Sequence, residues 1–100
     1  MSQWADFLIS AVRYNSEHAH IIKVIQHQDS VTSVGSGVEV LRTLVIQNIK
    51  LGLKYATIYS NGSQWKLGQR IILDTIKGIE YIKTVPDNIT ADNLGELPEF

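Results

Sequence analysis

Hydrophobic residues in this chain gather in short segments that polar or glycine-containing turns separate. The segments are rich in β-branched and aromatic residues, a pattern typical of strands. They predict strands at about 7–14, 18–26, 54–60, 64–76 and 79–85. Asn15-Ser16-Glu17 joins the first pair of strands as an antiparallel hairpin. Asn61-Gly62 is a strong hairpin-turn signal, because both residues tolerate a positive φ, and Lys77-Gly78 supplies a second tight turn.

The turn at Lys77-Gly78 also predicts a register for the last hairpin. A loop of two residues places three pairs opposite each other: Ile76 with Ile79, Leu73 with Ile82, and Asp74 with Tyr81. Gly68 interrupts the strand before this turn, and we expect a β-bulge there.

A helical spacing marks the middle of the chain. Apolar residues recur there at intervals of three and four: Val38, Leu41, Val45 and Ile49. Ser36 and Glu39 have the spacing of a capping box, in which each side chain bonds the other residue's amide. Gly52 suits the left-handed conformation that ends many helices. The pattern therefore predicts an amphipathic helix at about 37–51.

The segment 86–100 contains too many Asn, Asp, Gly and Pro residues for regular structure, yet its apolar residues fall at every third position. In a tight helical turn that spacing places them on one side. We predict that this tail docks on an edge or open face of the sheet, with Asp92 and Asn93 shaping the turn. The residues with this structural role are Asp92, Asn93, Leu94, Leu97, Pro98 and Phe100.

The elements in order, β-β-α-β-β-β, predict an α+β fold. One amphipathic helix cannot bury its apolar stripe alone, so it should pack on one face of a small antiparallel sheet. A chain of 100 residues forms one domain, residues 1–100, and is long enough to build a core without disulfides or bound metals.

Composition narrows the possible chemistry. The chain has no cysteine, which excludes disulfides, thiolate metal sites and a cysteine nucleophile and fits a reducing compartment. We see no signal peptide and no apolar run long enough for a membrane helix, and we expect a cytoplasmic protein with no membrane contact. The formal net charge of -1 provides no bulk attraction to nucleic acid, which we do not favour as a partner.

Three short motifs suggest ligand sites, and each also has a plain structural interpretation. His18 and His20 share a strand face and suggest a metal, but no carboxylate has a matching spacing. Gly35-Ser36-Gly37 precedes a helix start, where a phosphate can bind, yet it is no P-loop. The oxygen-rich run 87–93 lacks the calcium-binding frame of an EF-hand. We therefore predict no metal and no cofactor.

Aromatic and basic residues alternate in the later strands, and such a face can stack bases of single-stranded nucleic acid or hold a small ligand. Aromatic residues on strands are more often core or cross-strand partners. The candidate binding residues are Arg13, Tyr55, Tyr59, Trp65, Lys66 and Arg70.

The tail also carries a resemblance to a known family. The run Thr90-Ala91-Asp92-Asn93-Leu94-Gly95-Glu96-Leu97-Pro98-Glu99-Phe100, preceded by Tyr81-Ile82-Lys83-Thr84 and Pro86, resembles the ending of domain of unknown function 3892 (DUF3892). The opening Ile9-Ser10-Ala11-Val12-Arg13-Tyr14, the following His20-Ile21 and the helix before Gly52 fit its layout too. The resemblance implies a small stand-alone α+β domain of bacteria and phages, often found in prophage regions. It implies no activity, cofactor or catalytic residue.

The residues contain no nucleophile constellation and no paired-carboxylate motif. We therefore predict a non-enzymatic accessory protein, phage- or prophage-derived, that acts through protein–protein contacts with an unknown partner. A sheet edge can pair with that partner or with a second copy, which makes the protein a monomer or a weak homodimer. The alternative is a small-ligand or single-stranded nucleic-acid binding module that uses the aromatic and basic sheet face.

Overall fold

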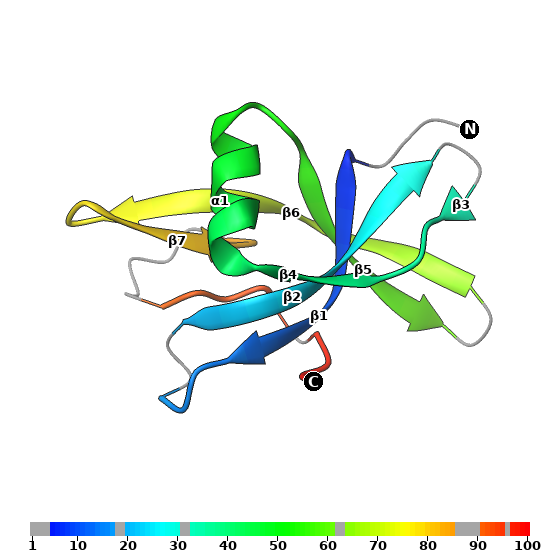
Figure 1. Cartoon of the computed structure of the whole chain (residues 1–100), viewed down its shortest axis with the longest axis horizontal. Coiled ribbons are helices and arrows are strands. Elements are labelled where there is room, and N and C mark those ends of the chain that lie inside the picture. The colour runs from blue at the N-terminus through cyan, green and yellow to red at the C-terminus, as the bar shows by residue number, and fades with distance from the viewer. Residues whose placement is uncertain (1–4, 18–19, 31–32, 62–63, 86–90, 96) are drawn as a thin grey trace.

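The computed structural model describes residues 5–17, 20–30, 33–61, 64–85, 91–95 and 97–100 (Figure 1). The elements are β1 (Phe7–Tyr14), β2 (Ile21–Ser30), β3 (Ser33–Val34), β4 (Val38–Leu41), α1 (Arg42–Lys50), β5 (Tyr55–Asn61), β6 (Gln64–Ile76) and β7 (Ile79–Lys83). Parts of several predictions lie outside the described residues: the start of the strand at 18–26, Gly62 of the Asn61-Gly62 turn, residues 86–90 and Glu96.

The strands form one seven-stranded sheet in the order β3-β2-β1-β5-β6-β7, with β4 beside β2. Most neighbours are antiparallel, but β1 and β5 run parallel where Phe7–Ile9 face Tyr55–Thr57. The α+β class is confirmed, whereas the expectation of a wholly antiparallel sheet is wrong. The crossover through α1 brings β5 back in the direction of β1, and parallel neighbours need a crossover of this kind.

The predicted hairpin register is confirmed between β6 and β7. Ile76 faces Ile79, Leu73 faces Ile82 and Asp74 faces Tyr81. Both turn residues have positive φ, 52° at Lys77 and 81° at Gly78, as a two-residue hairpin turn requires.

The bulge predicted at Gly68 is also confirmed. The pairing of β5 with β6 shifts between Ala56, which faces Arg70, and Ile58, which faces Leu67. Thr57 therefore lies opposite an extra residue, and its hydroxyl oxygen accepts a hydrogen bond from the Gln69 amide at 2.9 Å. A Cβ on Gly68 would lie 2.2 Å from the Thr57 hydroxyl oxygen, so only glycine fits there.

The helix is shorter than the predicted 37–51. Residues Val38–Leu41 form β4 and pair with Lys23–Gln26 of β2, so α1 begins only at Arg42. The capping box does not form: Leu41 precedes the helix with no side-chain cap, and the Glu39 carboxylate lies 3.6 Å from Lys23 Nζ. Valines favour strands, and the free edge of β2 was available to pair with them. The predicted end is confirmed, with φ 95° at Gly52.

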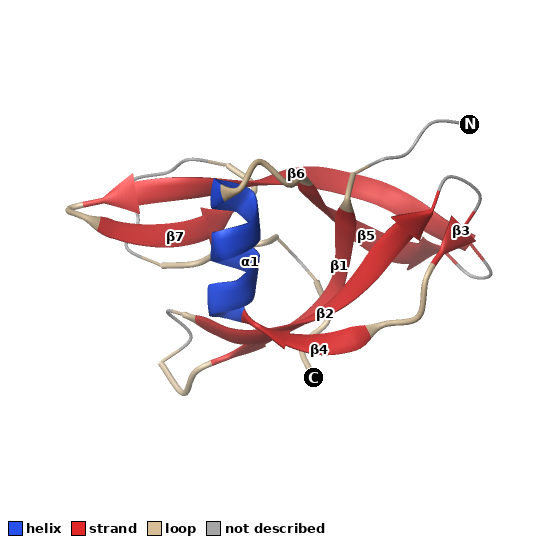
Figure 2. Ribbon diagram, turned by 45° about the horizontal axis from the view of Figure 1, so that its top comes forward, coloured by secondary structure: helices blue, strands red, loops and turns tan. Residues whose placement is uncertain are grey.

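The main core lies between α1 and the sheet. It joins Val45 and Ile46 of α1 to buried residues of β1, β2, β5, β6, β7 and the tail: Ile9, Val12, Ile21, Val24, Tyr55, Ile71, Ile82 and Leu94. Figure 2 shows α1 crossing between the β6–β7 hairpin and the β1–β2–β4 layer. A smaller buried cluster contains Ala5, Leu8, Ala56 and Ile58.

The tail joins β1 to β7. Asn93 forms an isolated parallel β-bridge with Lys83 of β7, and Glu99 forms another with Val12 of β1. Docking of the tail is therefore confirmed, but its described residues run extended instead of forming a helical turn. Gly95, with φ 79°, bends the backbone between the two bridges.

Candidate functional site

The predicted binding residues do not share one surface. Residues that face each other across strands lie on the same side of a sheet, and neighbours along a strand lie on opposite sides. Tyr59 faces Lys66, whereas Trp65 faces Ser60 and Arg70 faces Ala56, so the two groups occupy opposite sides.

The other two candidate residues, Tyr55 and Arg13, make contacts within the fold. Tyr55 is 1% exposed, and its hydroxyl donates to Gln26 Oε1 at 2.6 Å and accepts from Asn48 Nδ2 at 2.9 Å. Burial raises the pKa of Tyr55 above its ordinary 10.0, and the bond from Asn48 opposes this rise. Arg13, on β1, bonds the Phe100 carbonyl oxygen through Nε at 2.8 Å. Binding by the predicted residues stays a prediction, and Tyr55 has a structural role.

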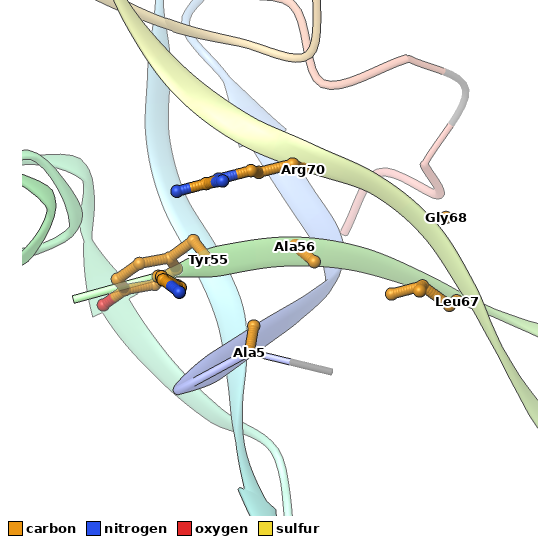
Figure 3. A pocket seen from close by; sticks show the side chains of 7 residues that line it. Ala5, Tyr55, Ala56, Leu67, Gly68 and Arg70 are labelled. Atoms are coloured by element: carbon orange, nitrogen blue, oxygen red, sulfur yellow. The ribbon is translucent and has the colours of Figure 1, made fainter. Parts of the chain in front are cut away.

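A basic hollow lies at the start of β5 (Figure 3). It has a volume of about 220 Å³, and Lys54 and Arg70 line it together with Ala5, Tyr55, Ala56, Leu67 and Gly68. The figure shows the Arg70 side chain extending from β6 and the Tyr55 side chain extending from β5, and both residues line the hollow. The side chains of Lys54 and Arg70 are exposed, and neither forms an ion pair with an acidic group in the described part of the chain.

The outer edge of β4 forms a second exposed feature. In the described residues β4 pairs with β2 and with no other strand. Val38 and Leu41 are each 55% exposed, and Leu44 in the first turn of α1 is also exposed. Unpaired backbone groups flanked by exposed apolar side chains are a template for a further strand.

The tail is held by one buried carboxylate. Asp92 Oδ2 accepts hydrogen bonds from the Ile21 amide at 2.8 Å and from Arg42 Nε at 2.7 Å. Its Oδ1 accepts from the Ile82 amide at 2.9 Å and from Arg42 Nη2 at 3.2 Å. The Asp92 side chain is 0% exposed and that of Arg42 is 19% exposed. This carboxylate ties the tail to β2, α1 and β7 at one point, a role beyond the turn we predicted for it.

The remaining tail residues divide between packing and backbone bonding. Leu94 belongs to the main core, and Leu97 packs against it. The Phe100 ring lies 4.9 Å from the Arg13 guanidinium. The Val12 amide donates to the Pro98 carbonyl oxygen at 2.9 Å, and Asn93 Oδ1 accepts from the Gly95 amide at 2.9 Å. The turn role predicted for Asn93 is therefore confirmed.

A hollow of about 450 Å³ lies where the tail meets the bulge of β6. Leu94, Gly95 and Leu97 form its tail side, and Thr57, Tyr59, Gly68 and Gln69 form its sheet side. The described residues that line it carry no charge, so this hollow offers apolar contact and no anchor for an ionic ligand.

The histidines do not form a metal site in the described part of the chain, which contains no cluster of three or more metal-ligating side chains. His18 lies outside the described residues. His20 stacks on Tyr81 with ring centroids 5.5 Å apart, and its Nδ1 lies 3.7 Å from Asp92 Oδ2. His20 thus borders the tail anchor.

The phosphate site considered at Gly35-Ser36-Gly37 depended on a helix start at residue 37. The helix begins at Arg42, and residues 35–37 lead into β4 instead. The free helical amides that would hold a phosphate are therefore not at this glycine-rich turn.

A serine–histidine pair lies inside the β1–β2 hairpin, a contact that the sequence did not reveal. Ser10 Oγ is 2.7 Å from His27 Nε2, and His27 Nδ1 is 2.9 Å from the Gly35 carbonyl oxygen. Such an arrangement can activate a serine, provided that a substrate reaches it. His27 is only 6% exposed, and none of the described hollows includes Ser10 or His27. The pair satisfies buried polar groups and joins the two strands.

Two further buried polar contacts serve the fold. Lys83 is 0% exposed, and its Nζ lies 2.8 Å from Asp74 Oδ2, so the charge is paired. The Tyr14 hydroxyl bonds the Leu94 backbone, and burial raises the pKa of Tyr14 above 10.0, with the charges of Asp92 and Glu99 adding to the rise. The first contact lies in the β6–β7 hairpin and the second joins β1 to the tail, so both have a structural role.

Comparison with known proteins matches the chain to a family model. No curated protein and no solved structure matches the chain. In the described residues no helix is long and apolar enough to cross a membrane. The family model described as a protein of unknown function, DUF3892, matches residues 8–98, and the chain therefore belongs to the DUF3892 family.

Proposed function

We propose that this DUF3892 protein is a non-enzymatic binding protein whose partner, another protein, adds an extended segment to the outer edge of β4. The observation that carries this proposal is a strand edge that no other described strand pairs with, combined with exposed apolar side chains beside it, Val38, Leu41 and Leu44. Strand addition obtains affinity from main-chain hydrogen bonds and specificity from alternate side chains.

Two charged side chains at the same edge, Glu39 and Lys23, would help to select and orient a partner. Glu39 and Lys23 form a half-exposed pair, with their charged atoms 3.6 Å apart. Charges at the border of an apolar contact contribute more to orientation and association rate than to affinity. An incoming segment would therefore carry apolar residues for Val38 and Leu41 and polar residues at the border.

The absence of catalysis is part of the proposal. Ser10 and His27 are a candidate nucleophile and base among the described residues. Neither residue lines a described hollow, which supports a binding role over a catalytic one. His27, the base of the pair, is only 6% exposed, which also favours a structural role for the contact.

A cytoplasmic, phage- or prophage-derived setting completes the proposal. A cysteine-free chain suits a reducing compartment, and the sequence resemblance implied a phage context. The neighbouring genes test this part: phage structural or regulatory genes beside it support the setting, and an operon of metabolic enzymes contradicts it.

Peptide selection tests the β4 site directly. A random peptide library is selected on the immobilised protein, and binding is remeasured with the double variant Val38→Lys/Leu41→Lys. We expect the selected peptides to carry apolar residues on both faces of the extended segment, because Val38 and Leu41 lie on opposite faces of β4. Their affinity for the double variant should fall at least about tenfold, since the lysines remove apolar contact and protect the edge. Amide hydrogen exchange in β4 should slow in the complex.

The matched control is Leu51→Lys/Val85→Lys, which adds two lysines at apolar positions that are 79% and 58% exposed and lie outside β4. Peptides that bind the β4 variant as tightly as the parent protein, or that protect amides elsewhere, would contradict the proposal. A concentration-dependent dimer that only the β4 variant loses would identify a second copy of the chain as the partner.

A further inference from the structure

Lys54 and Arg70 are placed together by the pairing of β5 with β6. Lys54 directly precedes β5, while Arg70 faces Ala56 across the two strands. The Lys54 amide donates to Asp6 Oδ2 at 2.7 Å, which fixes the start of β5 beside β1. The two cations therefore stand on a paired and bonded part of the sheet, so their backbone positions are set before any ligand arrives.

These cations have no competing acidic partner in the described residues. The ion pairs of the described chain use Lys23, Arg42, Lys50 and Lys83, and neither Lys54 nor Arg70 takes part in them. The Asp6 carboxylate accepts a hydrogen bond from the Lys54 backbone amide, and in the described residues it forms no ion pair with the side chain of Lys54 or Arg70. Two neighbouring cations without an ion-pair partner repel each other, and an anion that lies between them relieves this repulsion.

The same two residues line two hollows. One is the basic hollow of about 220 Å³ in Figure 3, with Ala5, Ala56 and Leu67 on its apolar wall. The other has a volume of about 310 Å³, and apart from Lys54 and Arg70 its walls are formed by Gly52 and apolar residues: Ile49, Leu53, Ile71, Ile72 and Leu73. Both hollows have a mixed lining, in which the two cations and backbone supply the polar part and the aliphatic side chains the apolar part. Such a lining offers an ionic anchor and room for a short hydrocarbon chain in one place.

We propose that Lys54 and Arg70 bind a small organic anion whose carboxylate lies between the two cations and whose short apolar chain occupies the larger hollow. The planar guanidinium of Arg70 can hold a carboxylate through two parallel bonds, and the Lys54 ammonium adds a point charge. A chain of about eight carbons suits a hollow of this size. This site is separate from the β4 edge and does not depend on it.

The experiment uses octanoate as the probe and two comparison ligands. Inorganic phosphate has the charge without the hydrocarbon chain, and octanol has the chain without the charge. Titration of the ¹⁵N-labelled protein should move the amide signals of Ala56, Gly68 and Leu73 with octanoate. Phosphate and octanol should each bind at least about tenfold more weakly, because each lacks one part of the recognition. The octanoate affinity should fall as salt is raised, since the two cations are exposed.

Substitutions assign the binding to the two cations. Arg70→Gln and Lys54→Gln should each weaken octanoate by about tenfold, the loss of one charged hydrogen-bonding group. Lys66→Gln is the matched control, because Lys66 is an exposed cation of the same strand that lines neither hollow. Thermal melting of each variant confirms that the fold is intact.

Two results would overturn the inference. One is an octanoate affinity that Arg70→Gln and Lys54→Gln leave unchanged. The other is phosphate or octanol binding as tightly as octanoate, which would show that charge or hydrocarbon acts alone. Neither result bears on the peptide selection at β4, so the two proposals fail separately.

Discussion

The tail and β4 are both short extended segments at the border of the sheet, but they differ in how they are held and in how much of their apolar surface is buried. The tail is fixed by the buried Asp92 carboxylate and by Leu94 in the core. β4 is held by backbone pairing with β2 and by Val40, which packs against the main core, while Val38 and Leu41 remain exposed. The difference shows that a strand without a buried charged anchor keeps apolar side chains at the surface, whereas the tail buries Leu94 beside its anchor.

Removal of the tail anchor should have the largest effect. Asp92→Asn puts an amide where the Arg42 guanidinium and the backbone amides of Ile21 and Ile82 donate, and it leaves Arg42 without its counterion. We expect the free energy of unfolding to fall by about 3–5 kcal/mol, as for other buried pairs that lose one partner. Urea unfolding followed by circular dichroism measures it.

The matched charge on β4 is Glu39, and Glu39→Gln should cost no more than about 1 kcal/mol because its pair with Lys23 is exposed. Equal losses from Asp92→Asn and Glu39→Gln would show that the tail is no better anchored than the edge strand.

Leucine substitutions compare the apolar contacts of the two segments. Leu94→Ala should destabilise the protein by about 2–5 kcal/mol, because Leu94 is only 2% exposed and the change leaves a cavity in the main core. Leu41→Ala should cost less than about 1 kcal/mol, because Leu41 is largely exposed. Thermal unfolding of both variants measures the contrast, and a larger loss at Leu41 would refute it.

Alkaline pH should weaken the contact between the tail and β1. The pKa of Tyr14 is raised in the folded state above its ordinary 10.0, chiefly by burial. As pH rises through 10, the unfolded chain releases the Tyr14 proton while the folded chain keeps it, so unfolding becomes more favourable. The stability of the parent protein relative to Tyr14→Phe should therefore decline above pH 10.

Urea unfolding at pH 7, 8.5 and 11 checks this expectation. The difference between the parent protein and Tyr14→Phe should stay constant between pH 7 and 8.5, below the pKa in both states, and shift against the parent at pH 11. A difference that is the same at all three values would show that Tyr14 ionises as readily in the folded protein as in the unfolded chain.

The smallest expected effect belongs to the β4 edge. Leu41→Lys should change the free energy of unfolding by no more than about 0.5 kcal/mol, as for most exposed positions. Guanidinium unfolding measures it. A loss above 2 kcal/mol would mean that Leu41 contributes to the fold and is not a free surface residue.

Local sequence patterns predicted much of the fold. The Lys77-Gly78 turn fixed the β6–β7 register, and Gly68 predicted the bulge, because turns and bulges depend on residues that are neighbours in the chain. Residues 38–41 were misassigned because their apolar spacing suits a helix, while the adjacent edge of β2, which decides the outcome, is not visible in local sequence.

The candidate sites were less predictable for the same reason. Asp92 meets Ile21, Arg42 and Ile82, and Ser10 meets His27, through contacts between distant parts of the chain. Arg70 was identified from its charge, but its neighbour Lys54 and the hollows beside them depend on the β5–β6 bulge and register. Charge and residue type thus identified single residues, and the tertiary fold grouped them.

The Asp92 anchor also has a consequence for folding kinetics. It connects Asp92 to residues that lie 71, 50 and 10 positions away in the sequence, and contacts as distant as the first two are slow to form. We expect the anchor to form after the folding transition state, with a φ-value near zero for Asp92→Asn. The substitution would then leave the folding rate nearly unchanged and speed unfolding, which makes Asp92 a determinant of how long each native molecule persists.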